Sequence, residues 1–198
     1  MAKRLFDLLG SALALLVLAP LLVLVALAVR LESPGPVFFR QQRVGRHGVP
    51  FRIHKVRTMV IDAQALGPLV TVGRDARITR VGHWLRHYRI DELPQFIDVL
   101  RGRMSLVGPR PEVPRFVAHY PADLKAKVLA VRPGITDPAS LAHIDEAALL
   151  AGAADPERAY IERILPHKLA LQADYAARAT LGSDLAVLVR TLRVLLSR

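Results

Sequence analysis

The sequence contains no cysteine and few acidic residues, and both shortages narrow what the protein can be. Without cysteine there is no disulfide scaffold, Cys-ligated zinc site, iron–sulfur cluster or cysteine nucleophile. Lys and Arg number 28 against 17 Asp and Glu, a net charge of +11, while 52% of residues are hydrophobic. This apolar fraction excludes a disordered chain. High positive charge combined with high hydrophobicity favours contact with both lipid and phosphate.

Residues 8–29 carry no formal charge and are mostly Leu, Val and Ala. At ~1.5 Å per residue an unbroken helix would be ~33 Å long, close to the hydrocarbon thickness of a bilayer. A polar turn that begins at Arg30 follows, with no small-residue cleavage site of a secretory signal. We therefore expect residues 1–31 to be a retained membrane anchor.

Pro20 lies in the middle of this segment and predicts a bend, because its ring clashes with the preceding turn and removes a helical hydrogen bond. Lys3 and Arg4 precede the segment, and Arg30 follows it. A re-entrant helix-break-helix would keep both basic ends in the cytoplasm, as the positive-inside tendency favours. A single Pro-kinked span is the alternative.

After the anchor, residues 37–44 and 49–56 alternate apolar and polar side chains around Gly45-Arg-His-Gly48, which predicts a β-hairpin. Residues 34–61 include several basic residues and no acidic residue, and the next acidic residue is Asp62. This stretch is either a surface for anionic headgroups or nucleotide phosphates, or the solvated face of a basic protein.

Helical periodicity follows over most of the remaining chain, at residues 78–88, 93–100, 121–130, 145–151, 155–178 and 183–197. The last segment carries a leucine stripe opposite its arginines, typical of a core-facing helix or of one that lies along a membrane interface. We predict an α+β, mainly α fold. It comprises the anchor (1–31) and a catalytic domain (32–198) with a small β-hairpin and interfacial amphipathic helices.

The chemically dense segment runs from residue 85 to residue 111. Pro94 fits a helix only in its first turn, so a helix should begin near 91–93, with Asp91 and Glu92 at its N-terminus. An acidic cap alone is ordinary capping. Arg86 and Arg89 lie just upstream, however, and Arg110 lies on the rigid turn Gly108-Pro-Arg-Pro111. Carboxylates among arginines can hold a divalent ion and a diphosphate together.

With these motifs the sequence resembles the bacterial sugar transferase family, the monotopic phosphoglycosyl transferases that act on polyprenyl phosphate. Each motif alone is weak, but their order and spacing are specific. Besides Arg86, the chain carries Lys3-Arg4-x-x-Asp7, Ser33-Pro-Gly-Pro36, Phe39-x-Gln-x-Arg43-x-Gly45, Lys55-x-Arg57-Thr-Met59, Asp75-x-Arg77-Ile-Thr79, Asp91-Glu-Leu-Pro-Gln95, Met104-Ser-Leu-Val-Gly-Pro-Arg-Pro111 and Arg132-Pro-Gly-Ile-Thr136. Its length resembles the minimal catalytic form of the family.

The resemblance implies transfer of a sugar-1-phosphate from a UDP-sugar to polyprenyl (undecaprenyl) phosphate, with release of UMP. By position, Asp91 would be the nucleophile that forms a covalent phosphosugar intermediate, and Glu92 its supporting carboxylate. Asp91 would also contact the Mg²⁺ cofactor. Arg86, Arg110 and Arg132 would bind substrate phosphates, since a guanidinium matches phosphate oxygens.

The family also implies a setting for this reaction. The catalytic domain would lie on the cytoplasmic face of the bacterial inner membrane, against membrane lipids, with a re-entrant anchor. Its lipid product would pass to downstream glycosyltransferases, which would build an exopolysaccharide, O-antigen or glycoprotein glycan.

Several positions depart from the family pattern. Asp98 stands where an Asn is common, and Arg103 where an acidic residue is common. Asp137 and Pro138 follow Thr136 where the family usually has Gly, which bears on substrate preference. A family Asp near the C-terminus has no secure counterpart, because Gln172 and Asp174 both lie near its position.

Two other functions are compatible with parts of the sequence. Net charge and the arginine-rich hairpin fit a membrane-tethered nucleic-acid-binding protein, although no nucleic-acid motif is present and we expect no nucleic-acid partner. An inactive scaffold for glycan assembly is the other alternative, which the intact Asp91 and Glu92 argue against.

Overall fold

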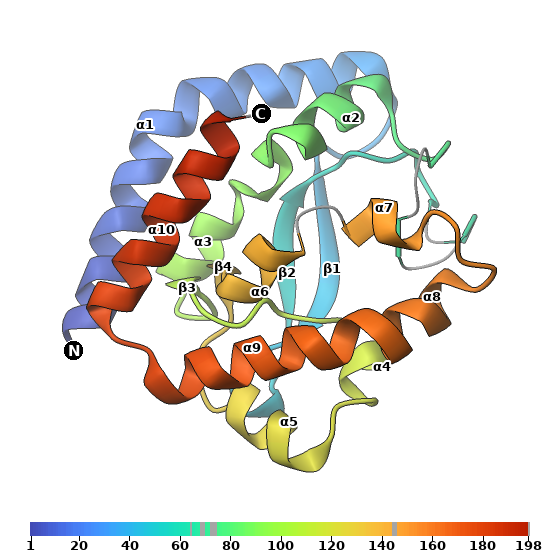
Figure 1. Cartoon of the computed structure of the whole chain (residues 1–198). Coiled ribbons are helices and arrows are strands. Elements are labelled where there is room, and N and C mark those ends of the chain that lie inside the picture. The colour runs from blue at the N-terminus through green and yellow to red at the C-terminus, as the bar shows by residue number, and fades with distance from the viewer. Residues whose placement is uncertain (64, 68–69, 72–74, 144–145, 198) are drawn as a thin grey trace.

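The computed structural model describes residues 1–63, 65–67, 70–71, 75–143 and 146–197 (Figure 1). Its strands are β1 (Phe38–Val44), β2 (Pro50–Val56), β3 (Ser105–Val107) and β4 (Gly134–Thr136). Its helices are α1 (Ala2–Glu32), η1 (Arg46–Gly48), α2 (Arg80–His87), η2 (Ile90–Glu92), α3 (Gln95–Leu100), α4 (Pro114–Val117), α5 (Ala122–Val128), α6 (Pro138–Ala142), α7 (Glu146–Leu150), α8 (Pro156–Ala159), η3 (Tyr160–Ile164), α9 (Leu165–Arg178) and α10 (Leu181–Leu196). The chain is thus mainly helical with a small β component, as predicted.

Helix α1 forms the anchor segment and runs through Pro20 without a break in its helical assignment. Figure 1 shows that it bends, so that its two ends run in different directions. Its first turns contact α3 and β3, and its second part contacts α2. There Val25 and Val29 pack against Val56 and Leu85. The expected bend is therefore present within one continuous helix.

Polar side chains in the first two turns of α1 attach it to β3. Asp7, which is buried, accepts hydrogen bonds from the Ser105 hydroxyl (2.8 Å) and the Leu106 N–H (3.1 Å). Lys3 donates to the Val107 carbonyl (3.1 Å) and pairs with Asp184 at the start of α10. The N-terminus of the anchor, one strand and the last helix are thereby tied together.

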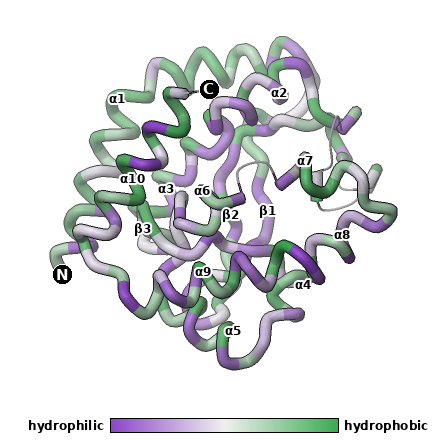
Figure 2. Tube along the Cα trace, in the orientation of Figure 1, coloured by the Kyte–Doolittle hydropathy of each residue, from purple (hydrophilic) through white to green (hydrophobic). Residues whose placement is uncertain are grey.

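Two helices expose apolar surface. Figure 2 shows α1 as predominantly hydrophobic, and it is long and apolar enough to cross a membrane. Large side chains are exposed along it, including Leu9, Leu13, Leu16, Val17 and Leu24, and along α10, including Leu185, Val189, Leu192 and Leu196. The opposite side of α10, with Val187 and Leu188, packs on β3 and Tyr175. The leucine stripe predicted for 183–197 is therefore divided between core and surface.

Strands β1 and β2 form the predicted antiparallel hairpin, with Val44 opposite Pro50 and Phe38 opposite Val56. Its basic residues have different environments. Arg43 donates to the Pro111 carbonyl, and Arg57 donates to three carbonyls at the end of α1 (Ser33, Pro34 and Pro36). Arg40 and Arg52 contact each other's carbonyls at the surface. The hairpin is therefore no uniform basic surface, because part of its charge holds neighbouring loops.

A second, parallel pair of strands, β3 and β4, was absent from the sequence-based expectation. Gly108, directly after β3, and Gly134, in β4, make this pairing possible. A Cβ on Gly134 would lie 2.1 Å from the Gly108 nitrogen, a distance that no side chain tolerates. The two glycines thus allow the backbones to approach and place the turn after β3 beside β4.

The main hydrophobic cluster lies between α4, α5, η3 and α9. The helix predicted over 155–178 is three consecutive segments, α8, the π-helical stretch η3, and α9. Beside this cluster the buried Glu112 accepts hydrogen bonds from Tyr160 (2.5 Å) and Lys168 (3.4 Å). Glu112 follows the Gly108–Pro111 turn, so this network supports the turn from behind.

Candidate active site

Asp91 and Glu92 lie in η2, a 3₁₀ turn between α2 and α3, rather than in the first turn of α3 as the sequence suggested. Arg89 adopts a left-handed conformation (φ 58°), which ends α2 and redirects the chain. Ile90 then packs against the cluster that includes Val56 and Leu85. This insertion buries the two carboxylates that follow it.

Glu92 is surrounded by three cations. Both terminal nitrogens of Arg110 donate to its carboxylate, Nη1 at 3.0 Å from Oε2, and Lys55 donates to Oε1 at 3.0 Å. Arg89 Nη1 lies 3.8 Å from Oε1. Burial alone would raise the pKa of Glu92, but Arg110 and Lys55 outweigh it and hold the pKa well below its ordinary value. Glu92 is therefore an ionised support that orders the cations of the site.

Asp91 has a different environment, although it is the next residue. Its Oδ2 lies 4.0 Å from the Lys55 Nζ, and within the described residues its carboxylate accepts no hydrogen bond. Burial raises its pKa, Lys55 opposes that shift, and Glu92 adds to it. The lone pairs of Asp91 are consequently available to an electrophile or a cation.

Arg110 owes its position to the β3–β4 pair. Its backbone N–H donates to the buried Asp137 carboxylate (3.0 Å), and its Nη1 donates to the Ile135 carbonyl (3.1 Å). Gln172 on α9 donates to the same Asp137 oxygen as the Arg110 N–H (2.8 Å). The departure at Asp137 thus contributes directly to the support of Arg110.

The remaining two predicted arginines lie in different places. Arg86 on α2 donates to the hydroxyls of Thr58 (2.9 Å) and Thr71 (3.0 Å), and its charge acts on Asp91. Arg132 donates to the Gly102 carbonyl (2.9 Å), beyond the C-terminal end of α3. Because Asp91 and Glu92 precede the N-terminal end of α3, the structure gathers Arg86 and Arg110 near the pair but not Arg132.

The sequence was compared with known families and proteins. The profile of the bacterial sugar transferase family matches residues 1–198. The chain belongs to the bacterial sugar transferase family. It is 42% identical over 199 residues to a UDP-glucose:undecaprenyl-phosphate glucose-1-phosphate transferase of Caulobacter vibrioides, covering 98% of this chain and 70% of the relative.

Two further relatives of this bacterial sugar transferase are longer. It is 38% identical over 197 residues to a UDP-N-acetylgalactosamine-undecaprenyl-phosphate N-acetylgalactosaminephosphotransferase of Aeromonas hydrophila, covering 98% of this chain and 44% of the relative. It is 43% identical over 136 residues to a UDP-glucose:undecaprenyl-phosphate glucose-1-phosphate transferase of Escherichia coli, covering 68% and 29%. The chain thus spans less than half of these two relatives.

Two residues of this bacterial sugar transferase site were not among the predicted site residues. Lys55 reaches the pair from β2, and Arg89 precedes it. In the sequence Lys55 belongs to the basic stretch 34–61 and to the motif Lys55-x-Arg57-Thr-Met59. The available signal was the position of Lys55, which follows Phe51 and Ile53 on one face of the period-two pattern of this strand.

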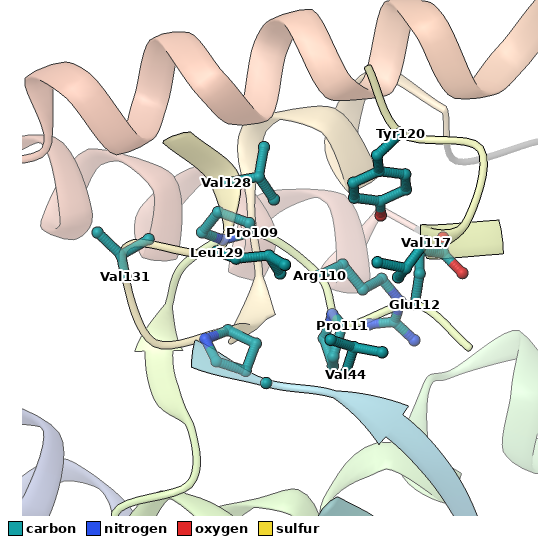
Figure 3. Close-up of a pocket in the computed structure, with 12 residues that line it drawn as sticks. Val44, Pro109, Arg110, Pro111, Glu112, Val117, Tyr120, Val128, Leu129 and Val131 are labelled. Atoms are coloured by element: carbon teal, nitrogen blue, oxygen red, sulfur yellow. The ribbon is translucent and has the colours of Figure 1, made fainter. Parts of the chain in front are cut away.

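A small cavity lies behind Arg110, lined by Val44, Pro111, Glu112, Tyr120 and neighbouring side chains (Figure 3). Its volume is about 10 Å³, which is room for about one water molecule. The cavity is therefore too small to admit a nucleotide. It belongs to the packing that supports the turn.

The residues of this site fit a magnesium ion in one particular way. Within the described part of the chain no three His, Asp or Glu side chains form a metal-binding group. Mg²⁺ is commonly held by one or two carboxylates together with substrate phosphates. Asp91, which carries no hydrogen bond among the described residues, can supply that carboxylate, whereas Glu92 is engaged by Lys55 and Arg110.

Proposed function

We propose that the protein transfers a sugar-1-phosphate from a UDP-sugar to a polyprenyl phosphate and releases UMP, through a covalent intermediate on Asp91. The observation that carries this proposal is the contrast between adjacent buried carboxylates. Glu92 is hydrogen-bonded to Lys55 and Arg110, while the Asp91 carboxylate accepts no hydrogen bond from the described residues and lies 4.0 Å from the Lys55 Nζ. Family membership and the names of the three relatives support the same reaction class.

In the first step, a carboxylate oxygen of Asp91 attacks the phosphorus that bears the sugar. The bond between that phosphorus and the oxygen bridging to UMP breaks, and the electron pair leaves with UMP. In the second step, an oxygen of the polyprenyl phosphate attacks the same phosphorus and displaces the carboxylate. The product is a polyprenyl diphosphate sugar, and Asp91 is regenerated without a separate general base.

The cations of the site have distinct roles in this proposal. Arg86 and Arg110 bind phosphate oxygens of the donor, and Lys55 holds Glu92 while its charge faces Asp91. Arg132 is not assigned such a role, because it donates to the Gly102 carbonyl beyond the C-terminal end of α3, whereas the Asp91–Glu92 pair precedes the N-terminal end of that helix. Mg²⁺, held by Asp91 and the diphosphate, would neutralise phosphate charge and assist departure of UMP. Addition of EDTA is expected to stop UMP release, and excess Mg²⁺ to restore it.

The exposed apolar faces of α1 and α10 support attachment to a membrane surface at which the polyprenyl phosphate lies. The bend of α1 supports a re-entrant anchor, with both ends and the catalytic domain on the cytoplasmic face of the bacterial inner membrane. Cysteines introduced near residues 2 and 33 should then both be labelled from the cytoplasmic side. Labelling of residue 2 only from the outside would establish a spanning helix. The lipid product would be extended by downstream glycosyltransferases.

A screen of UDP-sugars with undecaprenyl phosphate and Mg²⁺, followed by UMP release, tests the reaction. Mass spectrometry of the protein after incubation with the active donor alone should detect one added sugar-phosphate, located on the peptide that contains Asp91. Asp91→Asn should show neither the adduct nor turnover. Substantial turnover by that variant would eliminate Asp91 as the nucleophile.

A further inference from the structure

His54 is buried on β2 and hydrogen-bonded on both sides of its ring. Its backbone N–H donates to Asp98 Oδ2 at 2.8 Å, and its Nδ1 lies 2.8 Å from Asp98 Oδ1. Its Nε2 lies 3.3 Å from Arg101 Nη1. Asp98 has no exposed surface, and His54 is 8% exposed. The described contacts thus form a chain from Asp98 through His54 to Arg101.

The donors and acceptors of this chain have only one consistent arrangement. A guanidinium can only donate, so His54 Nε2 accepts from Arg101. The ring proton then lies on Nδ1 and is donated to the Asp98 carboxylate. Asp98 is itself fixed, because its backbone carbonyl accepts hydrogen bonds from Arg103 (3.0 Å) and Met104 (3.2 Å) where the chain leaves α3.

His54 and Lys55 are consecutive residues of β2, so their side chains point to opposite faces of the hairpin. On one face His54 fastens β2 to Asp98 of α3. On the other face Lys55 donates to Glu92 at 3.0 Å and lies 4.0 Å from Asp91. Glu92 lies in η2 and α3 begins three residues later, so the partners on the two faces of β2 belong to one short segment of the chain.

We propose that His54 and Asp98 are positioning residues for catalysis, which hold Lys55 against the Asp91–Glu92 pair by fixing β2 on α3. This inference deepens the proposed function and rests on it. His54 does not contact either carboxylate of the pair in the described structure, so it acts only through the strand. A displacement of about 1 Å in a catalytic group can reduce a rate a hundredfold.

The amide side chains separate the two contacts of His54. The nitrogen of Asn lies at the place of the histidine Nδ1 and can donate to Asp98, whereas Gln matches the position of Nε2. We therefore compare His54→Asn, His54→Gln and His54→Ala in the full chain, purified in detergent. His119→Ala is the matched control, because His119 is an exposed histidine outside the site.

UMP release should show kcat lowered about tenfold in His54→Ala, His54→Gln and Asp98→Ala, with KM for the UDP-sugar changed less than twofold. His54→Asn should stay within threefold of the wild type, and His119→Ala should equal it. In a Lys55→Ala background, measured by single-turnover adduct formation, His54→Ala should cause less than a twofold further loss. Equal losses of kcat in His54→Asn and His54→Ala would overturn the proposal. It would also be overturned if the adduct-formation rate of the double variant, His54→Ala with Lys55→Ala, fell by the product of the two single losses.

A spectroscopic measurement decides the positioning independently of turnover. With ¹⁵N-lysine, the Lys55 ammonium group should give a slowly exchanging signal, assigned by its loss in Lys55→Arg. The signal should persist in His54→Asn and disappear in His54→Ala, and its persistence in both would refute the inference. A wild type that releases no UMP from any UDP-sugar would instead refute the proposed function, while this signal would still report on the strand.

Discussion

Replacement of Asp91 or Glu92 by the corresponding amide should show which carboxylate acts in catalysis and which one stabilises the fold. Asp91→Asn removes the proposed nucleophile without breaking any hydrogen bond among the described residues. Because burial raises the pKa of Asp91, its charged form is disfavoured in the fold, and a neutral amide should be tolerated or slightly stabilising near pH 7. We expect no turnover and an unchanged or slightly higher melting temperature.

Glu92→Gln, in contrast, should lower the melting temperature. It leaves Arg110 and Lys55 without their charge partner in a buried site, and removal of one member of a buried ion pair costs about 3–5 kcal/mol. For a chain of this size about 1 kcal/mol corresponds to about 2–4 °C, so the melting temperature should fall by about 6–20 °C.

Circular dichroism at 222 nm in detergent measures this difference between the two variants. The pKa of Glu92 is well below its ordinary value of 4.5, so its stabilisation is present above pH 4.5 and is lost as pH falls through the folded-state pKa. The difference in melting temperature between the wild type and Glu92→Gln should therefore become smaller at acidic pH. Equal melting temperatures for Asp91→Asn and Glu92→Gln near pH 7 would refute the assignment of separate roles.

Two further substitutions test the supports of the site. Gly134→Ala should destabilise the fold by about 3 kcal/mol or more, because its Cβ would overlap the facing backbone. Gly152→Ala is the control, because a Cβ there meets no atom within 4 Å. Urea unfolding measures both variants, and equal midpoints would contradict the close approach of the two backbones. Lys168→Met should lower the free energy of unfolding by about 3–5 kcal/mol, because it removes a cation from the buried Glu112. Arg178→Ala, which breaks an exposed ion pair with Asp174, should lower it by less than about 1 kcal/mol. Similar losses of stability in thermal unfolding of the two variants would contradict the buried pairing.

The sequence predicts those features of the fold that are encoded locally. The hairpin follows from the period-two alternation on both sides of Gly45–Gly48, and α2, α5 and α10 follow from helical periodicity. Strands β3 and β4 escape such reasoning because each has three residues and their pairing joins segments far apart in the chain. The short helices α4 and α6 are missed for a similar reason, and the π-helical stretch η3 carries no pattern of its own.

The candidate site divides in the same way. Asp91, Glu92 and Arg110 lie in compact motifs, and the structure places Arg110 in hydrogen-bond contact with Glu92, while the roles of these residues stay predictions. Lys55 joins them only because the hairpin packs on η2, and Arg132 turns to Gly102 only because the end of α3 presents a free carbonyl. Such contacts depend on tertiary packing, which no single motif specifies.

The attachment of α1 through Lys3 and Asp7 bears on how the protein can be handled. The hydrophobic helix α1 is more than a membrane anchor. Lys3 and Asp7 in its first two turns form hydrogen bonds with the Ser105 hydroxyl and with backbone groups of β3. Deletion of residues 1–31 to obtain a soluble fragment would strip hydrogen-bond partners from Ser105 and Leu106, just upstream of the turn that carries Arg110. Removal of α10 would disturb the same junction from the other end of the chain, because Asp184 pairs with Lys3.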